Sequence, residues 1–441
     1  MYSLLPPLAY LLSLLSCLLF AYTVTSPSIP RCHPLRVAVV FLIILSCAAT
    51  AYTARFCSGL RGWNAFVGTT FGIGFVFETL DVLVLQPCCR GVVLFPFDDR
   101  DRDRDRDGSP KGKSPASRWR RLQAGLDLAL NKRKIGTTLQ VRNLPSFSRT
   151  DPSWIPSRTQ FLVFRTVRVV LTYLLIELLT GLEPAAAPDI SGKVAPGQEW
   201  ILWRIVSGLM TPLEAGEVVG LTLVFWFLMY LVQMLGYDAF SIVAVGVLGV
   251  DGPRDWPPRF GALGETWSVR RFWGVFWHQD LRHSLTTISE FIVHDVLRLP
   301  RGSSSTTSAT TLLTRYAKIH LVFLLSALVH LSTDSFMGVP PAESGAVTFY
   351  CTHAAGILFE DAVAALYRAW TGPGTGRGSR ASSSSSSSKV NSPEPKARWI
   401  RAVGYLWTLA FLSWSTPAWA YPQMRVEMQF PLPVRVLTRR W

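Results

Sequence analysis

The stretch "LVFLLSALVHLSTD" (321–334) decides the fold class of this chain. It lies in an apolar run near 317–337, and a helix needs roughly 20 mostly apolar residues to cross a hydrocarbon core of ~30 Å. Backbone groups in lipid must be satisfied internally, so such a run is helical. His330 and Asp334 interrupt this run, and polar groups at membrane depth are costly and tend to be functional. The stretch therefore predicts a membrane helix that carries a functional site.

Other apolar runs repeat this pattern along the chain. Of the 441 residues, 49% are hydrophobic and 17% are charged, whereas about 25% of the residues in ordinary soluble proteins are charged. We therefore predict an all-α, polytopic integral membrane helical bundle with about eight spanning helices plus short re-entrant or interfacial helices. The predicted spans are 4–24, 36–54, 64–86, 161–183, 217–236, 317–337, 346–370 and 400–421, and the shorter stretches are 200–213 and 238–250. No basic residue precedes the first run, so it is interpreted as a retained helix rather than a secretory signal.

The net charge of +15 resides in the loops rather than in a nucleic-acid-binding patch. Segments 87–160, 251–316 and 371–399 are basic, while 184–199 and 338–345 carry almost no basic residues. If the short 200–213 stretch does not cross the membrane, the positive-inside rule places the three basic segments in the cytoplasm and the N-terminus in the lumen. We expect a multi-pass protein of the endoplasmic reticulum. Arg55, Arg61 and the arginines after residue 421 fit this topology poorly. No nucleic-acid partner and no protein partner is indicated.

Composition also divides the chain into regions. The N-terminal transmembrane helices occupy 1–86, and a basic, partly disordered cytoplasmic loop follows at 87–160. A membrane domain covers 161–422, interrupted by a Ser/Gly-rich linker at 372–396, and 423–441 form a tail. The strictly alternating "DDRDRDRDRDG" (98–108) can bury no apolar surface and is predicted to be a tether.

The seven cysteines do not suggest a metal site. They show no CxxC spacing, and most lie in or beside apolar runs, so neither a zinc site nor a disulfide framework is indicated. Cys88 and Cys89, at the end of a helix, could be palmitoylated or could fill space as small apolar residues. No metal and no tightly bound cofactor is expected.

His330 has two possible roles. It could be a core histidine bonded to a backbone carbonyl, or a neutral imidazole that accepts a proton. Ser326 and Asp334 lie four residues to either side of it, so all three share a helix face, and Asp334 could orient the ring. Other acidic residues in apolar runs, which also need partners, are Glu78, Asp81, Glu177, Glu360 and Asp361.

A second cluster of polar and aromatic residues is "RRFWGVFWHQDLRHSL" (270–285). One interpretation is an interfacial helix whose rings face the headgroups while its arginines face water. That interpretation leaves His278 and Gln279 unexplained, because an interfacial helix needs no paired donors beside its rings. The ring-bearing residues are Phe272, Trp273, Phe276 and Trp277. The histidines at 283 and 294 are predicted to be ordinary, partly solvated side chains, while those at 320 and 353 are weaker candidates for a function.

These segments together resemble a known family. "WSVRRFWGVFWHQDLR" (267–282) is similar to the SxRxFWGxxWHQxLR signature of wax synthase-like membrane-bound O-acyltransferases. "LLSALVHLSTD" (324–334) resembles their second signature, and "GILFEDAV" (356–363) and "GYLWTLAFLSWSTPAWAYP" (404–422) follow in the same order. The resemblance covers roughly 200–422, with the main motifs in 267–363, and implies that 161–422 is an acyltransferase domain.

The resemblance implies an acyl-CoA:alcohol O-acyltransferase. Fungal members acylate terpenoids or polyketides, often with acetyl groups from acetyl-CoA, and plant members esterify long-chain alcohols. The expected partners are acyl-CoA, a lipophilic alcohol and membrane lipid. Wax ester or sterol acylation is an alternative, and a transporter with an intramembrane His/acid relay is a rival of another class.

The chemistry of acyl transfer assigns a role to each candidate residue. A base must take the hydroxyl proton, and donors must stabilise the oxyanion. We assign the first role to His330 and the second to His278 with Gln279; wider relatives have Asn at the position of His278. Cations should hold the phosphates of coenzyme A. They are predicted to be Arg270, Arg271 and Arg282, and the supporting residues are Gln279, Asp334, Trp277 and Glu360.

Overall fold

The computed structural model describes residues 5–26, 34–54, 61–89, 118–181, 190–301, 309–371 and 395–429. Every regular element within these ranges is helical, as the sequence predicts. The predicted tether at 98–108 and residues 372–394 of the second linker lie outside these ranges. The α-helices are α1 (Leu5–Thr25), α2 (Pro34–Ala54), α3 (Arg61–Val67), α4 (Gly74–Thr79), α5 (Arg118–Leu130), α6 (Arg158–Gly181), α7 (Ile190–Lys193), α8 (Ile201–Val206), α9 (Pro212–Ile242), α10 (Val269–Arg271), α11 (Arg282–Phe291), α12 (Ala309–Met337), α13 (Ala346–Thr371) and α14 (Pro395–Gln429). Shorter π- or 3₁₀-helical segments are η2 (Gly68–Ile73), η3 (Leu80–Cys89), η4 (Val243–Leu248), η5 (Pro253–Asp255), η6 (Leu263–Glu265), η7 (Phe272–Phe276) and η8 (Ile292–Val296).

The helices form two compact units that alternate along the chain. The first unit comprises Met1–Arg142, Gln279–Val347 and Pro422–Trp441. The second comprises Asn143–His278 and Thr348–Tyr421. The chain therefore passes from the second unit to the first between His278 and Gln279, inside the segment that the sequence singles out.

The core of the first unit joins α1, α2, α4, η3 and α5. Phe20 and Phe75 are fully enclosed, with ring centroids 5.4 Å apart. α5 approaches α1 so closely at Gly125 that a Cβ there would lie 2.6 Å from the carbonyl oxygen of Ala21. Small residues allow such backbone approach between membrane helices. The other buried apolar residues of this core are Cys17, Val40, Ile43, Cys47, Val82, Leu83, Leu128 and Ala129.

The helix over 61–89, built from α3, η2, α4 and η3, packs against α12 in the same unit. At Gly68 a Cβ would lie 2.7 Å from the ring of Phe336. The hydroxyls of Thr69 and Thr333 bond each other at 2.8 Å. These contacts place the helix that carries His330 beside the helix that carries Glu78 and Asp81.

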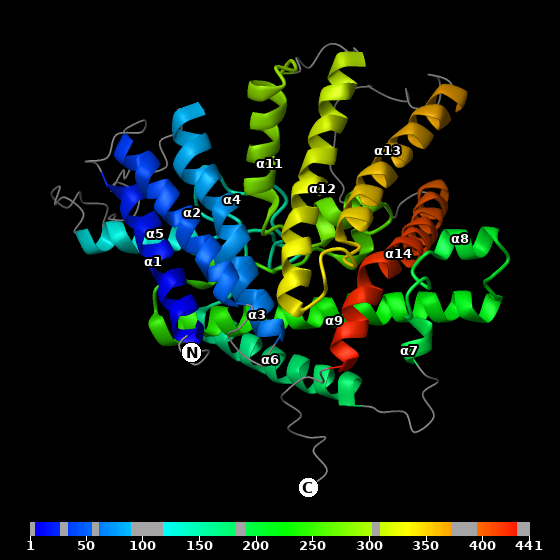
Figure 1. Cartoon of the computed structure of the whole chain (residues 1–441), viewed down its shortest axis with the longest axis horizontal. Coiled ribbons are helices and arrows are strands. Elements are labelled where there is room, and N and C mark those ends of the chain that lie inside the picture. The colour runs from blue at the N-terminus through cyan, green and yellow to red at the C-terminus, as the bar shows by residue number, and fades with distance from the viewer. Residues whose placement is uncertain are drawn as a thin grey trace, which may run out of the picture. The chain divides into compact units, whose positions relative to one another are not determined.

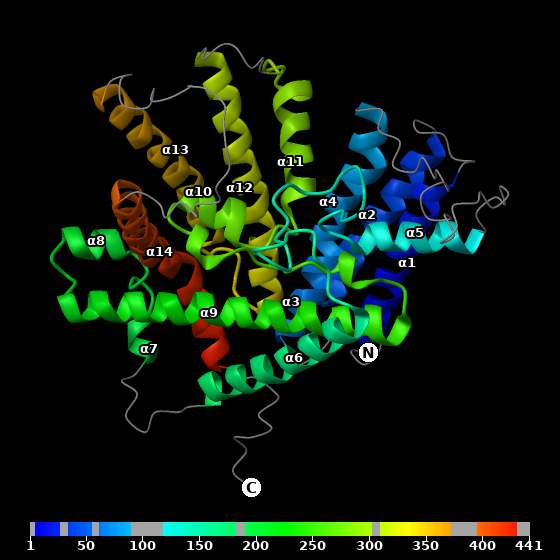
Figure 2. The ribbon, with the colours of Figure 1, turned by 180° about the vertical axis from the view of Figure 1, so that it is seen from behind.

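In the second unit α6 and α9 lie side by side (Figures 1 and 2). α9 begins at a capping box, in which the Thr211 hydroxyl accepts from the Glu214 N–H and the Glu214 carboxylate accepts from the Thr211 N–H. The helix continues through η4 and ends at Gly249, whose φ of 62° suits glycine. Aromatic residues dominate the core of this unit, which comprises Met234, Phe260, Phe272, Phe276, Trp277 and Leu412.

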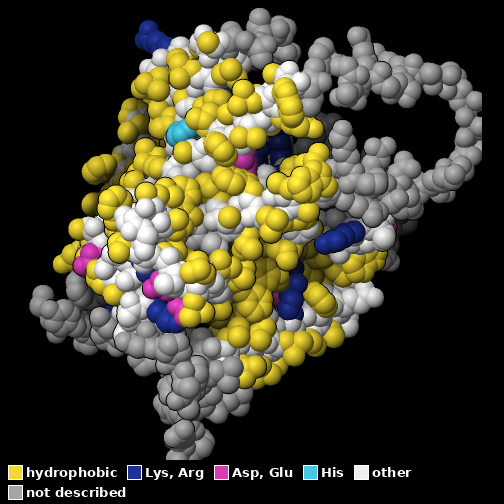
Figure 3. Space-filling model, turned by 90° about the vertical axis from the view of Figure 1, so that its right-hand side faces the viewer, with side chains coloured by type: hydrophobic (Ala, Val, Ile, Leu, Met, Phe, Trp, Pro, Cys, Tyr) yellow, Lys and Arg dark blue, Asp and Glu magenta, His cyan; other side chains and the backbone are white. Residues whose placement is uncertain are grey.

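Large apolar side chains cover much of the described part of the face in Figure 3. Leu11 of α1, Phe41 of α2 and Leu213 of α9 are all more than half exposed. Monomeric soluble proteins rarely expose contiguous apolar surface of this kind. By length and composition, five helices among the described residues can cross a membrane: Pro7–Thr25, Pro34–Thr53, Asn64–Gln86, Pro212–Leu248 and Ala309–Met337.

The predicted count of about eight spans is not confirmed. The runs at 161–183, 346–370 and 400–421 correspond to α6, α13 and α14, which are not among the five. α6 contains Arg165, Arg168 and Glu177, and such charges lower the apolar content of the helix. The stretch at 238–250, predicted to be separate, instead continues α9 as one candidate span, and α8 occupies part of 200–213.

Candidate active site

His330 lies on α12 in the first unit. Its Nδ1 is 2.8 Å from the backbone oxygen of Ser326, one turn earlier on the same helix. A ring nitrogen bonded to a carbonyl oxygen must carry the proton, so Nδ1 is the donor in the neutral imidazole. The lone pair is then on Nε2. A neutral imidazole in this tautomer presents Nε2 as a proton acceptor.

Asp334 lies one turn beyond His330 and is almost completely buried. Its Oδ2 accepts a hydrogen bond from the Ser344 hydroxyl at 2.5 Å, and its Oδ1 accepts one from the Gln423 amide at 2.8 Å. The carboxylate thus joins the end of α12 to the 338–345 loop and to α14. An orienting role toward His330 stays a prediction, since the Ser326 carbonyl already fixes the ring through Nδ1.

In the second unit Glu360 of α13 fixes the start of the aromatic–His segment. Its carboxylate accepts the backbone N–H groups of Val269 at 2.6 Å and Arg270 at 3.1 Å, and the Trp407 indole N–H at 2.9 Å. The Ser268 hydroxyl caps the same turn through the Arg271 N–H. A carboxylate at this position satisfies amides that a helix start otherwise leaves unpaired. The geometry gives the predicted supporting residue Glu360 a physical role.

The aromatic rings after this turn are packed inside the second unit. Trp277 lies 4.8 Å from the ring of Trp226 and stacks on Phe272 at 5.7 Å. The His278 ring lies 5.5 Å from Trp277 and 6.1 Å from Phe260. Phe272, Phe276 and Trp277 are buried, so the interpretation of an aromatic face at the headgroups is wrong for them: α9 and α14 supply enough apolar surface to enclose the rings.

His353 of α13 is fully buried among the rings of Phe349, Trp273 and Phe411. Its Nδ1 bonds the Phe349 carbonyl at 2.8 Å, and within the described residues its Nε2 has no hydrogen-bond partner. A groove of about 390 Å³ lies beside it between α13 and α14. The groove is lined by Thr352, Ala355, Gly356, Phe359, Trp407, Phe411 and Trp414.

The three predicted phosphate-binding arginines differ in their partners. Arg270 forms an ion pair with Asp361 at 2.5 Å. Arg271 pairs with Glu265 and lies over the Trp267 ring. Arg282 belongs to the first unit, where burial and, secondarily, the like charge of Arg142 lower its pKa. Arg282 and Arg142 are neighbouring like charges, and an anion bound beside them would offset their repulsion.

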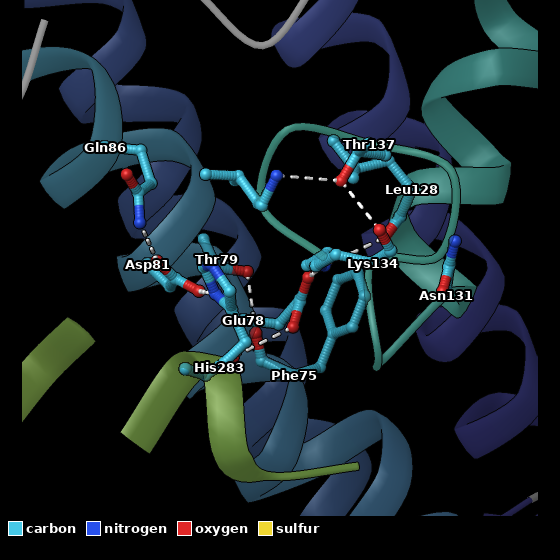
Figure 4. Close-up of polar contacts among 12 residues, drawn as sticks. Phe75, Glu78, Thr79, Asp81, Gln86, Leu128, Asn131, Lys134, Thr137 and His283 are labelled. Atoms are coloured by element: carbon cyan, nitrogen blue, oxygen red, sulfur yellow. Dashed lines mark hydrogen bonds and ion pairs between the residues drawn. The ribbon is translucent and has the colours of Figure 1, made fainter. Parts of the chain in front are cut away.

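Sequence reasoning missed a buried polar network in the first unit (Figure 4). Asp81, which is fully buried, accepts from the His283 Nδ1 at 2.6 Å and from the Gln86 amide at 3.0 Å. The Ser284 hydroxyl donates to Glu78 at 3.1 Å, and Lys134 forms an ion pair with Glu78. His283 is partly buried, and its buried carboxylate partner is not predicted by the sequence analysis. The available signal was the pair of acids inside the apolar run 64–86, because buried carboxylates require partners.

Comparison with known proteins agrees with this chemistry. Residues 256–352 match the model of the membrane bound O-acyl transferase family. Acetyltransferase ataH of Aspergillus terreus is 34% identical over 299 residues, which are 67% of this chain and 87% of the relative. Acetyltransferase spyB of Aspergillus fumigatus is 32% identical over 67% of this chain and 47% of its own length. Acetyltransferase pyr8 of the same species is 29% identical over 72% of this chain and 68% of its own length.

No solved structure matches this chain. The matched region contains both the aromatic–His segment and the helix that carries His330. The chain belongs to the membrane bound O-acyl transferase family and is an acyltransferase.

Proposed function

We propose that this enzyme transfers an acetyl group from acetyl-CoA to a hydroxyl of a lipophilic secondary metabolite, a terpenoid or polyketide, in the membrane of the endoplasmic reticulum. The similar fungal proteins are named acetyltransferases, which supports the acyl group. The observation that carries the proposal is His330, whose Nδ1 bonds the Ser326 carbonyl in an apolar helix, so that the lone pair of a neutral ring is on Nε2.

The reaction needs no covalent intermediate. The acceptor O–H gives its proton to the Nε2 of His330 while its oxygen attacks the thioester carbon. His278 and Gln279 donate hydrogen bonds to the developing oxyanion. The C–S bond then breaks, the coenzyme A thiolate leaves, and it takes the proton back from the imidazolium. Arg282 with Arg142 binds the coenzyme phosphates, because a bound anion offsets the repulsion of these two like charges.

The test is ester formation by membranes containing the enzyme, labelled acetyl-CoA and a lipophilic alcohol. His330→Ala should lower kcat by about 10²–10⁴-fold, the usual cost of losing a general base. His320→Ala is a matched control, because His320 lies on the same helix and bonds the Tyr316 carbonyl in the same way but is exposed. His278→Asn should be milder than His278→Ala, since Asn keeps a donor.

Two outcomes would contradict the proposal. If His330→Ala keeps more than about a tenth of the activity at equal expression, His330 is not the base. If the wild-type enzyme releases no thiol from acetyl-CoA in the presence of any tested alcohol, while a longer acyl-CoA is consumed, the acetyl assignment is wrong.

A further inference from the structure

We propose that His283, through its hydrogen bond to Asp81, is a positioning residue for the acyl transfer: it fixes the start of α11 and thereby holds Gln279 in place. The inference rests on the proposed function in one respect, the use of Gln279 as an oxyanion donor. The inference also involves a network of residues that take no part in the proposed catalytic steps: Glu78, Asp81, Gln86 and Lys134.

The network begins with three side chains near one face of α11. His283 bonds Asp81, Ser284 bonds Glu78, and Thr287 accepts from the Gln86 amide at 3.2 Å. His283 and Thr287 are four residues apart, the spacing that places two side chains on the same face of a helix. All three side chains bond residues of the helix over 61–89 within the first unit, and Figure 4 shows the contact of His283 with Asp81.

The partner helix presents its polar groups together because it is π-helical at this point. Gln86 and Asp81 are five residues apart in η3 and their side chains bond each other. In an α-helix, two side chains that are five residues apart point in different directions. In a π-helix the backbone hydrogen bonds join residues that are five apart, so these side chains lie on the same face. The π-helical segment therefore lets one amide hold both Asp81 and Thr287.

Burial makes these contacts strong. Glu78, Asp81 and Gln86 are at most 1% exposed, and Lys134 is fully enclosed. A buried carboxylate is costly unless it is paired and hydrogen-bonded, so Glu78 depends on Lys134 and Asp81 on His283. Burial also lowers the pKa of Lys134 to about 7. Asp81 accepts hydrogen bonds from His283 and from the Gln86 amide. If the donor on His283 is removed, the bond from Gln86 remains and the bond from His283 is lost.

The same turn connects His283 to Gln279. The Arg282 N–H donates to the Gln279 carbonyl at 3.2 Å, and Leu285 donates to Leu281 at 3.1 Å. Leu281 occupies the N-cap position and makes no side-chain capping bond. The start of α11 therefore lacks the usual local anchor, and the tertiary bonds of His283 and Ser284 replace it. Gln279, which is itself buried, follows any shift of this turn.

The experiment distinguishes the role of Nδ1 of His283 from that of Nε2. His283→Asn keeps a donor at the position of Nδ1, His283→Gln places its amide nearer to Nε2, and His283→Leu removes both. We expect the Leu and Gln variants to lose about ten- to a hundred-fold in kcat, because an error of about 1 Å in position can cost ~10²-fold. The apparent KM for acetyl-CoA should change less than about two-fold, and Asn should restore kcat to within about three-fold. His294→Leu is the matched control: this histidine lies in η8, directly after α11, and within the part of the chain that the structure describes it bonds the Leu299 carbonyl.

A double-variant cycle tests the route through Gln279. If His283 acts by positioning Gln279, His283→Leu should add little to the loss already caused by Gln279→Ala, since coupled residues are not additive. Fully additive losses would overturn the inference, as would an unchanged kcat in His283→Leu. An Asn variant no better than Leu would show that Nε2 is the functional atom and would overturn it as well. Gln279→Ala at wild-type activity would instead refute the oxyanion role in the proposed function. If His283→Leu does not fold, the Asn and Gln variants decide alone.

Discussion

At the scale of single residues, the environment of a histidine rather than its local bond defines its role. His320, His330 and His353 each bond the carbonyl four residues earlier in their helix. The first is exposed, the second partly buried in an apolar span, and the third enclosed by rings. Sequence patterns predict the helix-internal bond equally for all three, so only the apolar context and the motif favour His330.

Arg282 should dominate the binding of acyl-CoA. Arg282→Gln is expected to raise the apparent KM for acyl-CoA by about ten- to a hundred-fold, because it removes a charge-assisted hydrogen bond to phosphate worth about 1.5–3 kcal/mol. The double variant Arg270→Gln/Arg271→Gln should have a smaller effect, since these two arginines already bind Asp361 and Glu265. The KM for the alcohol should stay constant.

Arg301→Gln is the control for this prediction, because it also removes an arginine charge but both Arg301 and its partner Asp295 are exposed to solvent. Initial-rate kinetics with varied acyl-CoA give both parameters. If the Arg270/Arg271 double variant changes the KM for acyl-CoA more than Arg282→Gln does, Arg270 and Arg271 of the second unit, rather than Arg282, bind the phosphates.

Individual partners of these residues could not be predicted from the sequence. The acids at 78 and 81 stand out in an apolar run, and the pattern correctly indicates that they need partners. The partner of Asp81 is His283, which lies 202 residues further along the chain. No local periodicity encodes such a pairing. The spacing within the aromatic–His segment likewise identifies His278 but not the rings that enclose it.

At the scale of helices, a buried charge cluster explains why α9 is longer than the sequence predicts. Asp238 interrupts the apolar pattern and suggests a break. In the structure Arg165 and Arg168 of α6 both bond this carboxylate, and Arg165 also donates to the Trp256 carbonyl at 2.6 Å. Because the charge is compensated from the neighbouring helix, α9 continues as a helix into η4.

Asp238→Ala should destabilise the second unit strongly. Removing one member of a buried ion pair typically costs 3–5 kcal/mol, because the remaining charge stays buried and uncompensated. Arg165 is buried in this cluster. Thermal unfolding in detergent should show the loss. Glu217→Ala, which breaks the partly exposed Lys193–Glu217 pair of the same unit, should cost only about 0–1 kcal/mol. If the two variants lose the same amount of thermal stability, the ion pairs of Asp238 are not what holds α6 against α9.

At the scale of the whole molecule, sequence predicts the class of fold better than its assembly. Apolar runs locate the helices, since the physics of a bilayer fixes their length. They do not reveal which helices pack together, and each compact unit takes segments from distant parts of the chain. In a helix such as α6, charged residues are paired with a neighbouring helix. The sequence alone then does not distinguish a membrane span from a helix buried inside the protein.

The charge distribution predicts the orientation of the chain, and this prediction can be tested across α12. The segment before this helix is basic, and the 338–345 loop after it has no Lys or Arg. The positive-inside rule therefore predicts cytoplasmic residues before α12 and lumenal residues after it. An N-glycosylation acceptor sequence inserted after Pro341 should be modified in microsomes, and one inserted after Arg301 should not. Mass shifts that an endoglycosidase removes provide the measurement, with retained ester formation as the check on folding. Modification only after Arg301 would reverse the orientation, and Arg282 would then no longer be available to cytoplasmic acyl-CoA.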